Sequence, residues 1–531
     1  MTQPKEKSQS ANQKIAQAAG TVMAAFIISN LVGVIRGVVI TDAFGTSTEL
    51  DSFNAANRIA EMLFNIVAGG ALGSAFIPSF TGFLTRDDRT GAWRLASGVI
   101  NLVFLVLILI SVLAWIFAPQ IVREGLFVLV PESDPVQEAL TISLLRIMLP
   151  SVVIFGISGL VMGILNAHQV FLLPSIAPAL YSLGMILGTL LLPENWGVKR
   201  LAIGVVAGAL MHLLVQIPKL WQLKDRAYYF YLGLKNKAVV KVFRLMGPRL
   251  LGVAVVQLNF IVNTIIALGQ PEGSVSAITL AFALMLMPEQ AVAQSAAIAS
   301  LPTFSAQVAM DKLDEMRGSL ASTLRAVLML AIPASVGLIL LRIPLVSVLY
   351  QRGEFTAQST MLVAWALLWY AAGLVGHALV EILSRAFYAL HDTRTPVAVG
   401  VIAMGLNIGF SLLFSSVFER VGWMPHGGLA LANSLATGME SAVLLVLMSR
   451  RLKGLEGVKV WKGVGISALG TGLMAAVVVG WQQVFQSGSN LVILFGALGL
   501  GVAVYLGVMW ALKVPELRGM LRVMIKKIKR D

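Results

Sequence analysis

The chain of 531 residues contains no cysteine. This absence excludes a disulfide framework, a cysteine-ligated zinc site and a thiol nucleophile. Charged residues are also scarce, at 12% of the chain, whereas hydrophobic residues make up 57%. Because a soluble domain of this length could not bury so much apolar surface in one core, the composition indicates a membrane protein.

The sequence also lacks the motifs of an enzyme. No nucleophile–base pair or phosphate-binding loop is recognisable, and the five histidines show no metal-ligand spacing. Residues 1–17 are polar and lack the apolar core of a secretory signal, so we expect a short cytoplasmic tail there. We therefore expect neither catalysis nor a bound cofactor or metal. An ion gradient, the membrane potential or removal of product would drive any transport, and the sequence leaves these alternatives open.

Long apolar stretches occupy most of the chain. We interpret about fourteen of them as membrane-spanning helices, because a helix of roughly 20 apolar residues crosses a bilayer with its backbone polar groups satisfied. The expected starts are Ala18, Asp51, Ala96, Leu140, Phe171, Leu201, Met246, Val275, Leu320, Thr356, Pro396, Gly427, Gly463 and Leu491. The predicted fold class is an all-α integral membrane protein.

Basic residues crowd onto alternate connections between these stretches. One side collects the lysines before Ala18, the groups Arg86–Arg94, Lys219–Arg244, Lys312–Arg317, Arg394 and Arg450–Lys462, and the tail from Lys513. The other side carries Arg123, Lys199, Arg200, Arg342, Arg352 and Arg420. Because cytoplasmic loops are normally rich in Lys and Arg, we expect both termini in the cytoplasm. The net charge of +14 therefore reflects membrane topology, and we expect no nucleic-acid partner.

An internal repeat divides the chain. Phe76–Phe80 (FIPSF) is similar to Ser300–Phe304 (SLPTF), and Leu165–His168 is similar to Tyr388–His391 at nearly the same separation along the chain. An even number of spans lies between the copies, so the halves share one orientation, as in transporters whose two bundles rock about a cavity. The expected organisation is an N-terminal tail (1–17), an N-terminal six-helix bundle (18–222), a cytoplasmic linker (223–244), a parallel C-terminal six-helix bundle (245–449), an extra helix pair (450–512) and a basic cytoplasmic tail (513–531).

Ionisable residues within spans usually face a cavity or a charged partner. Arg36 lies near the outer end of the first span, and Asp51, Arg58 and Glu61 follow on the second. An arginine in a water-filled cavity offers a planar fork suited to phosphate oxygens. The alternatives are that Arg36 extends to the outer surface or forms a structural pair with Asp51.

Five segments resemble the MurJ (MviN) family, lipid II flippases of the multidrug/oligosaccharidyl-lipid/polysaccharide exporter superfamily. They are Ser29–Arg36 with its continuation to Phe53, Gly70–Pro78, Met246–Thr264, Leu349–Thr356 and Arg385–Pro396. These segments occur in family order over most of the chain, and the last two are quite specific.

The resemblance implies a monomeric flippase in the bacterial cytoplasmic membrane. It would move lipid II, the precursor of cell-wall peptidoglycan, from the inner to the outer leaflet by alternating access. The extra helix pair would hold the undecaprenyl tail, and the basic tail at Arg522–Arg530 would lie on anionic lipids.

The resemblance also assigns expected roles to individual residues. Arg36 matches a family arginine thought to bind the diphosphate, Asp51 an acidic position and Ser29 a polar one, while Arg58 occupies a position where a basic residue is common. With Glu61, these residues are the candidates for headgroup binding. The candidates for gating or coupling are Glu289, Glu381, Arg385 and Asp392; Glu61, Glu289 and Glu381 would either carry protons or serve as packed hydrogen-bonding carboxylates.

Several positions depart from the family pattern. Gly37 stands where Asp is usual, Phe64–Asn65 where a second basic residue is expected, and Gly69–Gly70 where the family has Glu-Gly. Thr279–Met285 carries no charge where a cavity arginine is expected. These departures leave three hypotheses: a divergent lipid II flippase, an exporter of another polyprenyl-linked glycan, and a non-transporting scaffold of envelope assembly.

Overall fold

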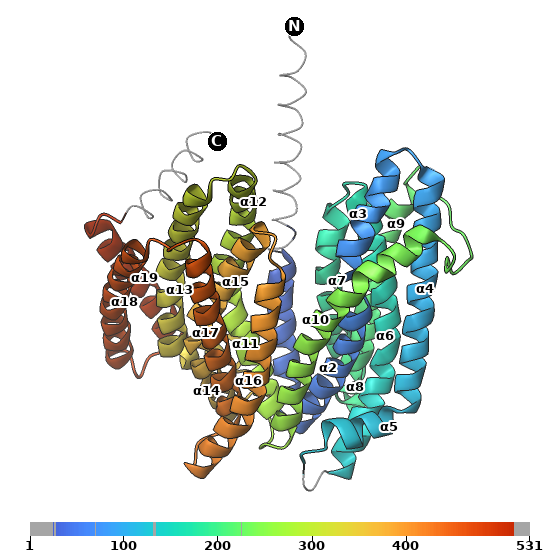
Figure 1. Ribbon diagram of the computed structural model, residues 1–531. Coiled ribbons are helices and arrows are strands. Elements are labelled where there is room, and N and C mark those ends of the chain that lie inside the picture. Colours follow the sequence, from blue (N-terminus) through green and yellow to red (C-terminus); the bar gives the residue numbers. More distant parts are fainter. Residues whose placement is uncertain (1–24, 26–27, 69–70, 131–133, 225, 515–531) are drawn as a thin grey trace. The chain divides into compact units, whose positions relative to one another are not determined.

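A computed structural model describes residue 25 and residues 28–68, 71–130, 134–224 and 226–514. Long helices dominate these residues, and no strand occurs among them. The predicted all-α membrane fold is confirmed. Contacts divide the chain into two compact units, one running to Glu272 and including Arg352–Glu354, the other formed by Gly273–Gln351 and the chain from Phe355 onward (Figure 1).

The first unit is built from helices that begin and end at recognisable signals. Asp88, Asp134 and Asn236 each accept a hydrogen bond from a backbone N–H of the first helical turn that follows. The elements are the helical segment 28–44, α2 (Thr48–Ala68), α3 (Ala71–Thr85), α4 (Arg89–Ile116), α5 (Ala118–Gln120), a π-turn (Ile121–Leu126), α6 (Pro135–Ala167), α7 (Leu172–Leu191), a 3-10 turn (Glu194–Trp196), α8 (Lys199–Leu214), α9 (Ile217–Trp221) and α10 (Lys237–Leu268).

The second unit contains the remaining helices. They are α11 (Ser274–Glu289), a π-turn (Gln290–Gln294), α12 (Ser295–Ala309), α13 (Leu313–Tyr350), α14 (Ala357–Ala372), α15 (Leu374–Ala389), α16 (Arg394–Arg420), α17 (His426–Arg451), α18 (Gly457–Val484) and α19 (Asn490–Ala511). A core of buried apolar side chains joins α12, α13, α15 and α17, and a second core packs α18 and α19 against α13.

Ten helices among the described residues are long and apolar enough to cross a membrane, or eleven if the bent pair α14 and α15 forms one span. Four further segments are helical, but none of them meets this criterion of length and apolar character: residues 28–44, α2, α3 and α10. In α2 the reason is its charge, since Asp51, Arg58 and Glu61 interrupt the apolar run. The count of fourteen spans therefore remains a prediction.

Helices α7 and α8 pack with their backbones in close contact. Gly184 and Gly188 on α7 face Gly204 and Gly208 on α8, and a Cβ atom added to Gly188 would lie 2.6 Å from the Cα atom of Gly204. Glycine at a spacing of four residues places the small positions on one helix face, which permits this approach in a membrane.

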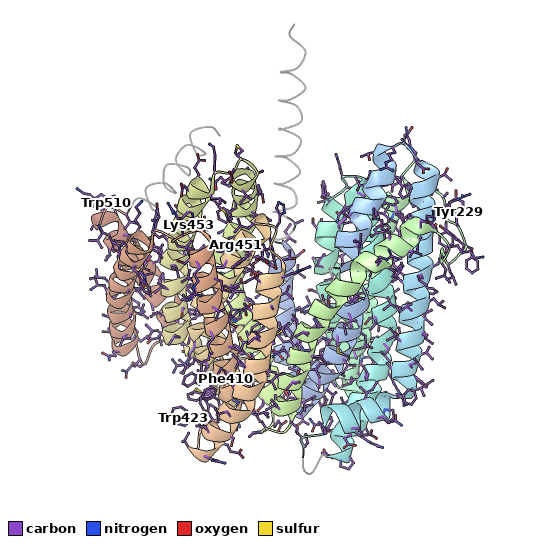
Figure 2. All side chains as sticks on the ribbon, viewed as in Figure 1. Tyr229, Phe410, Trp423, Arg451, Lys453 and Trp510 are labelled. Atoms are coloured by element: carbon purple, nitrogen blue, oxygen red, sulfur yellow. The ribbon has the colours of Figure 1, made fainter. Side chains whose placement is uncertain are left out.

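The connection between α9 and α10 is bound along α4. The Asn101 amide donates to the carbonyl oxygens of Tyr229 and Tyr231 at 3.0 and 2.9 Å, and the Ser97 hydroxyl accepts from the Tyr229 backbone N–H. Figure 2 shows Tyr229 beside α4. The predicted linker (223–244) covers this connection and the first turns of α10, which belongs by its contacts to the first unit. The predicted bundle boundaries remain predictions.

The ends of the helices in the second unit differ in chemistry. Trp365, Trp369, Phe418 and Trp423 form an aromatic cluster around the end of α16. Arg451 and Lys453 lie at the opposite end of the unit from Trp423 (Figure 2). Because tryptophan is enriched at membrane–water boundaries, the cluster at Trp423 is consistent with one such boundary.

Candidate functional site

A cavity of about 520 Å³ lies within the first unit. Four helices line it, α2, α6, α7 and α8, through Asn57, Ala60, Glu61, Phe64, Asn65, Ser151, Val152, Phe155, Gly159, Met162, Pro178, Tyr181, Val205 and His212. Asn57, Glu61 and Asn65 follow one another at intervals of one helical turn, so α2 presents all three on the same face. The cavity is therefore polar along α2 and mostly apolar elsewhere.

Glu61 is held in this cavity by two neighbours on its own helix. One carboxylate oxygen accepts from the Asn57 amide at 2.9 Å, and the other accepts from Nη1 of Arg58 at 3.1 Å. The Arg58 guanidinium also lies 4.9 Å from the ring centre of Phe260 on α10. Its buried Nε finds no hydrogen-bond partner among the described residues, so the guanidinium keeps an unused donor.

Arg36 and Ser29 both contact α7. Nη1 of Arg36 donates to the Ser182 hydroxyl at 3.3 Å, and the Ser29 hydroxyl donates to the Ser175 carbonyl oxygen at 3.1 Å. Seven residues, about two helical turns, separate Ser29 from Arg36, which places them on the same face of the segment 28–44. Arg36 is not among the residues that line the cavity, but its charge and that of Glu61 both act on Tyr181.

Asp51 occupies a different position from the other predicted headgroup residues. It lies in the first turn of α2 and is only 4% exposed. The structure therefore pairs Arg58 with Glu61, which lines the cavity while Arg58 does not. It places Arg36 and Ser29 of the segment 28–44 against α7, and leaves Asp51 buried in the first turn of α2.

A buried polar network beside the cavity was not predicted from the sequence. Nδ1 of His212 lies 2.7 Å from the Ser158 hydroxyl, and the Gln216 amide donates to that hydroxyl and to the His212 carbonyl oxygen, each at 2.9 Å. His212 and Gln216 are one turn apart on an otherwise apolar stretch. The spacing of His212 and Gln216 was the signal of this network in the sequence. Ser158 contacts them only because of the fold.

In the second unit, Glu289, Glu381 and Arg385 form a charged group. Nη2 of Arg385 lies 3.2 Å from Oε2 of Glu381, and both charges act on Glu289, which is only 6% exposed. Glu289 follows Pro288 and precedes the π-turn that interrupts the helix before α12. π-Helical interruptions within an α-helix are frequent at functional sites.

Asp392, the fourth predicted coupling residue, lies apart from this group in the turn between α15 and α16. Its carboxylate accepts from the backbone N–H and hydroxyl of Thr395 and from Nη1 of Arg451, the last at 2.7 Å. The backbone hydrogen bond from Thr395 contributes most to holding the pKa of Asp392 below its ordinary value, and Arg451 acts in the same direction. This geometry fixes the start of α16.

No group of three or more His, Cys, Asp or Glu side chains suitable for a metal ion occurs within the described part of the chain. Two positions that depart from the family pattern, Phe64 and Asn65, line the cavity. The uncharged segment Thr279–Met285 lies within α11. An amide therefore contributes to the cavity where a second basic residue was expected.

Comparisons with known proteins agree on one family. A family model described as lipid II flippase MurJ matches residues 40–498. A lipid II flippase MurJ of Burkholderia cenocepacia is 30% identical over 511 residues, which cover 93% of this chain and 96% of that protein.

Solved structures show the same fold. A lipid II flippase MurJ in an inward closed conformation superposes with a TM-score of 0.76 at 24% identity, covering 92% of this chain and 97% of that one. A multidrug resistance MATE family transporter of the MOP superfamily, in an inward-facing conformation, gives a TM-score of 0.67 at 15% identity, covering 83% and 99%.

Proposed function

The chain belongs to the MurJ family of lipid II flippases, and from this premise we propose that it moves lipid II from the inner to the outer leaflet of the bacterial cytoplasmic membrane. The match to a lipid II flippase over 93% of the chain is the observation that carries this proposal. The chain is accordingly a multi-pass membrane transporter and not an enzyme, and it supplies the precursor for peptidoglycan synthesis outside the cell membrane.

Arg36 and Arg58 are the residues proposed to bind the diphosphate of the substrate. Each guanidinium is held by a hydrogen bond from Nη1, which Arg36 donates to the Ser182 hydroxyl and Arg58 to the Glu61 carboxylate. A planar guanidinium fork matches the oxygens of a diphosphate in geometry and in charge. Ser29, Asp51 and Glu61 complete the proposed headgroup site, with Glu61 holding Arg58 in place.

The proposed cycle is alternating access, in which the substrate site opens to one side of the membrane at a time. Glu289, Glu381 and Arg385 are proposed to couple the cycle to an ion or to the membrane potential, because buried charges respond to both. Asp392 would set the position of α16 during the cycle.

The proposed setting follows from the distribution of charge and from the family. Both termini lie in the cytoplasm of a bacterial cell, and the protein acts as a monomer. Its partners are lipid II and the anionic lipids around the basic tail, with no nucleic acid. Helices α18 and α19, which pack on α13, would form the groove for the undecaprenyl tail.

Complementation tests the proposed function. The chain is expressed in cells whose own lipid II flippase can be switched off, and survival and lipid II in the outer leaflet are measured. Wild type should rescue growth, and Arg36→Ala should abolish rescue while inserting normally. Correct insertion without export of lipid II in any host would favour another polyprenyl-linked cargo or a scaffold role.

A second substitution separates the charge of Arg36 from its planar shape. Arg36→Lys keeps the charge but loses the planar fork, so it should retain part of the transport that the alanine variant loses. Full rescue by Arg36→Ala, at equal amounts in the membrane, would show that Arg36 does not bind the substrate.

A further inference from the structure

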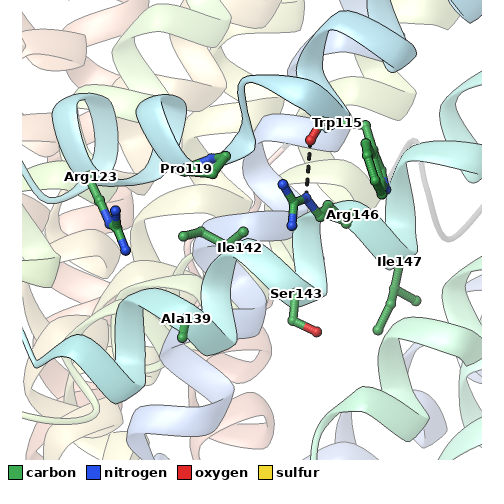
Figure 3. Close-up of a pocket in the computed structure, with 8 residues that line it drawn as sticks. All are labelled: Trp115, Pro119, Arg123, Ala139, Ile142, Ser143, Arg146 and Ile147. Atoms are coloured by element: carbon green, nitrogen blue, oxygen red, sulfur yellow. Dashed lines mark hydrogen bonds between the residues drawn. The ribbon is translucent and has the colours of Figure 1, made fainter.

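A second pocket of about 520 Å³ lies in the first unit where α4 ends and α6 begins. Its lining comprises Trp115, Pro119, Arg123, Ala139, Ile142, Ser143, Arg146 and Ile147 (Figure 3), and none of these residues lines the cavity at Glu61. The two charged residues in this lining are both arginines. The proposed transport site makes no use of this pocket.

Arg146 is held in one orientation by Trp115. Its Nε–H donates to the Trp115 carbonyl oxygen at 3.1 Å, and its guanidinium lies 4.6 Å from the centre of the Trp115 ring. In Figure 3 the two terminal nitrogens of Arg146 point between Pro119 and Ile142, toward the interior of the pocket. The fixed Nε leaves these terminal donors for a ligand.

The charges around the pocket do not cancel. Nε of Arg123 lies 3.0 Å from Oε2 of Glu138, so that arginine is paired. Arg146 has no carboxylate within ion-pair distance among the described residues. Within the described part of the chain, the pocket therefore holds one cation without a carboxylate partner and with two terminal nitrogens left as donors, an arrangement that favours an anion with several acceptor oxygens.

The position of the pocket indicates which kind of anion it would bind. Trp115, Ile116 and Phe117 are each about half exposed at the end of α4, a helix of 28 residues that ranks among the candidate spans. Exposed aromatic residues at the end of a span mark the boundary between hydrocarbon and headgroups. Helix α6 has 33 residues, about 50 Å in length, and so extends past a hydrocarbon core of about 30 Å.

We propose that this pocket binds the phosphate of an anionic glycerophospholipid at the membrane surface, with Arg146 as its principal ligand and Arg123 at its edge. The apolar lining of Ile142, Ile147 and Pro119 would contact the glycerol and the first carbons of the acyl chains. A pocket of this volume falls within the range of small-ligand sites.

The test is crosslinking of a photoreactive phosphatidylglycerol to the purified full-length protein in neutral detergent, followed by mapping of the labelled peptides. Label is expected on residues 115–147, with phosphatidylcholine a weak competitor. Arg146→Gln should weaken binding by about tenfold or more, the loss expected for hydrogen bonds to a charged group. Arg420→Gln, which removes an exposed arginine at the end of α16, is the matched control and should leave the label on residues 115–147 unchanged.

Arg123→Gln gives a second measurement if the Arg146 variant fails to fold, because the Arg123 side chain is 61% exposed and carries little of the fold. It should weaken binding by about threefold. Unchanged labelling in both variants would overturn the proposal. Displacement of the probe by millimolar inorganic phosphate would indicate a site for soluble anions instead, and displacement by equimolar lipid II would assign the pocket to the transport path.

Discussion

Arg58 and Glu61 form an ion pair one helical turn apart on α2, with 3.1 Å between Nη1 and Oε2. The two side chains are 23% and 44% exposed, so water screens the pair and its contribution to stability is small, at about 1 kcal/mol or less. Because Glu61 lines the cavity, we expect the pair to matter more for the proposed substrate site than for the fold.

Exchanging these charges separates a structural role from a binding role. The double variant R58E/E61R keeps an ion pair on α2, so the free energy of unfolding should stay within about 1 kcal/mol of wild type. Transport should still be lost, because the cation no longer has the position from which it meets the diphosphate. If R58E alone abolishes complementation and the double variant restores it, the role of the pair is structural and not substrate binding.

Ser182 positions Arg36, and its removal should have a graded effect. Ser182→Ala deletes the acceptor for Nη1 of Arg36 but leaves the guanidinium charge, so transport should fall severalfold without being abolished. Ser175→Ala is the matched control on the same helix, since Ser29 donates to the backbone of Ser175 and keeps its partner. Initial rates of lipid II export at equal membrane levels measure both; equal rates for the two variants would refute the positioning role.

The close approach of α7 and α8 predicts intolerance to any side chain at their contact. Gly188→Ala forces a Cβ atom against Gly204, and the overpacking should cost about 1–3 kcal/mol of unfolding free energy. Gly82→Ala on α3, where a Cβ would meet nothing within 4 Å, should be neutral or slightly stabilising. Thermal unfolding in detergent compares the two, and a neutral Gly188→Ala would contradict the observed packing.

Asp392 predicts a pH-dependent contribution to stability. Because the pKa of Asp392 is lower in the folded protein than its ordinary value, the carboxylate stabilises the fold above pH of about 4, and this contribution is lost as the pH falls through the folded value. Asp392→Asn should therefore lower the melting temperature at pH 7 by a few degrees.

The melting temperatures of wild type and Asp392→Asn should converge as the pH falls below the ordinary range for aspartate. Asp314→Asn removes a carboxylate that is 90% exposed and should show little difference at any pH. A constant gap between wild type and Asp392→Asn across the acid range would show that the charge of Asp392 is not the cause.

The sequence predicts the helices well because a long apolar run is stable in the membrane only when its backbone hydrogen bonds are satisfied within a helix. It predicts their ends less well: α6 was expected from Leu140, whereas it begins at Pro135, since polar turns continue a helix beyond the hydrocarbon. The expected linker at 223–244 overlaps α10 for the same reason, because a basic run can be helical when Asn236 caps it.

Contacts between side chains far apart in the chain could not be predicted from the sequence. Arg36 and Ser182 are 146 residues apart, and nothing in either segment encodes their contact. Arg58 and Glu61 were predictable as neighbours from their spacing, but the stacking of Arg58 on Phe260 depends on the packing of α10 in the first unit. The pairing of Glu381 with Arg385 follows from one helical turn, whereas the presence of Glu289 beside them requires the fold.

The connection between α9 and α10 has a consequence for evolutionary change. Asn101 and Ser97 on α4 bind the backbone atoms of Tyr229 and Tyr231, so these three hydrogen bonds do not depend on which side chains stand at 229 and 231. Substitutions at 229 leave them intact, whereas a substitution at Asn101 removes both of its bonds to the backbone and a third, which its Oδ1 accepts from the Tyr228 hydroxyl. Among diverging relatives, selection should therefore preserve positions 97 and 101 and the tyrosine hydroxyls at 228 and 231, which bind α4, more strongly than the side chain at 229.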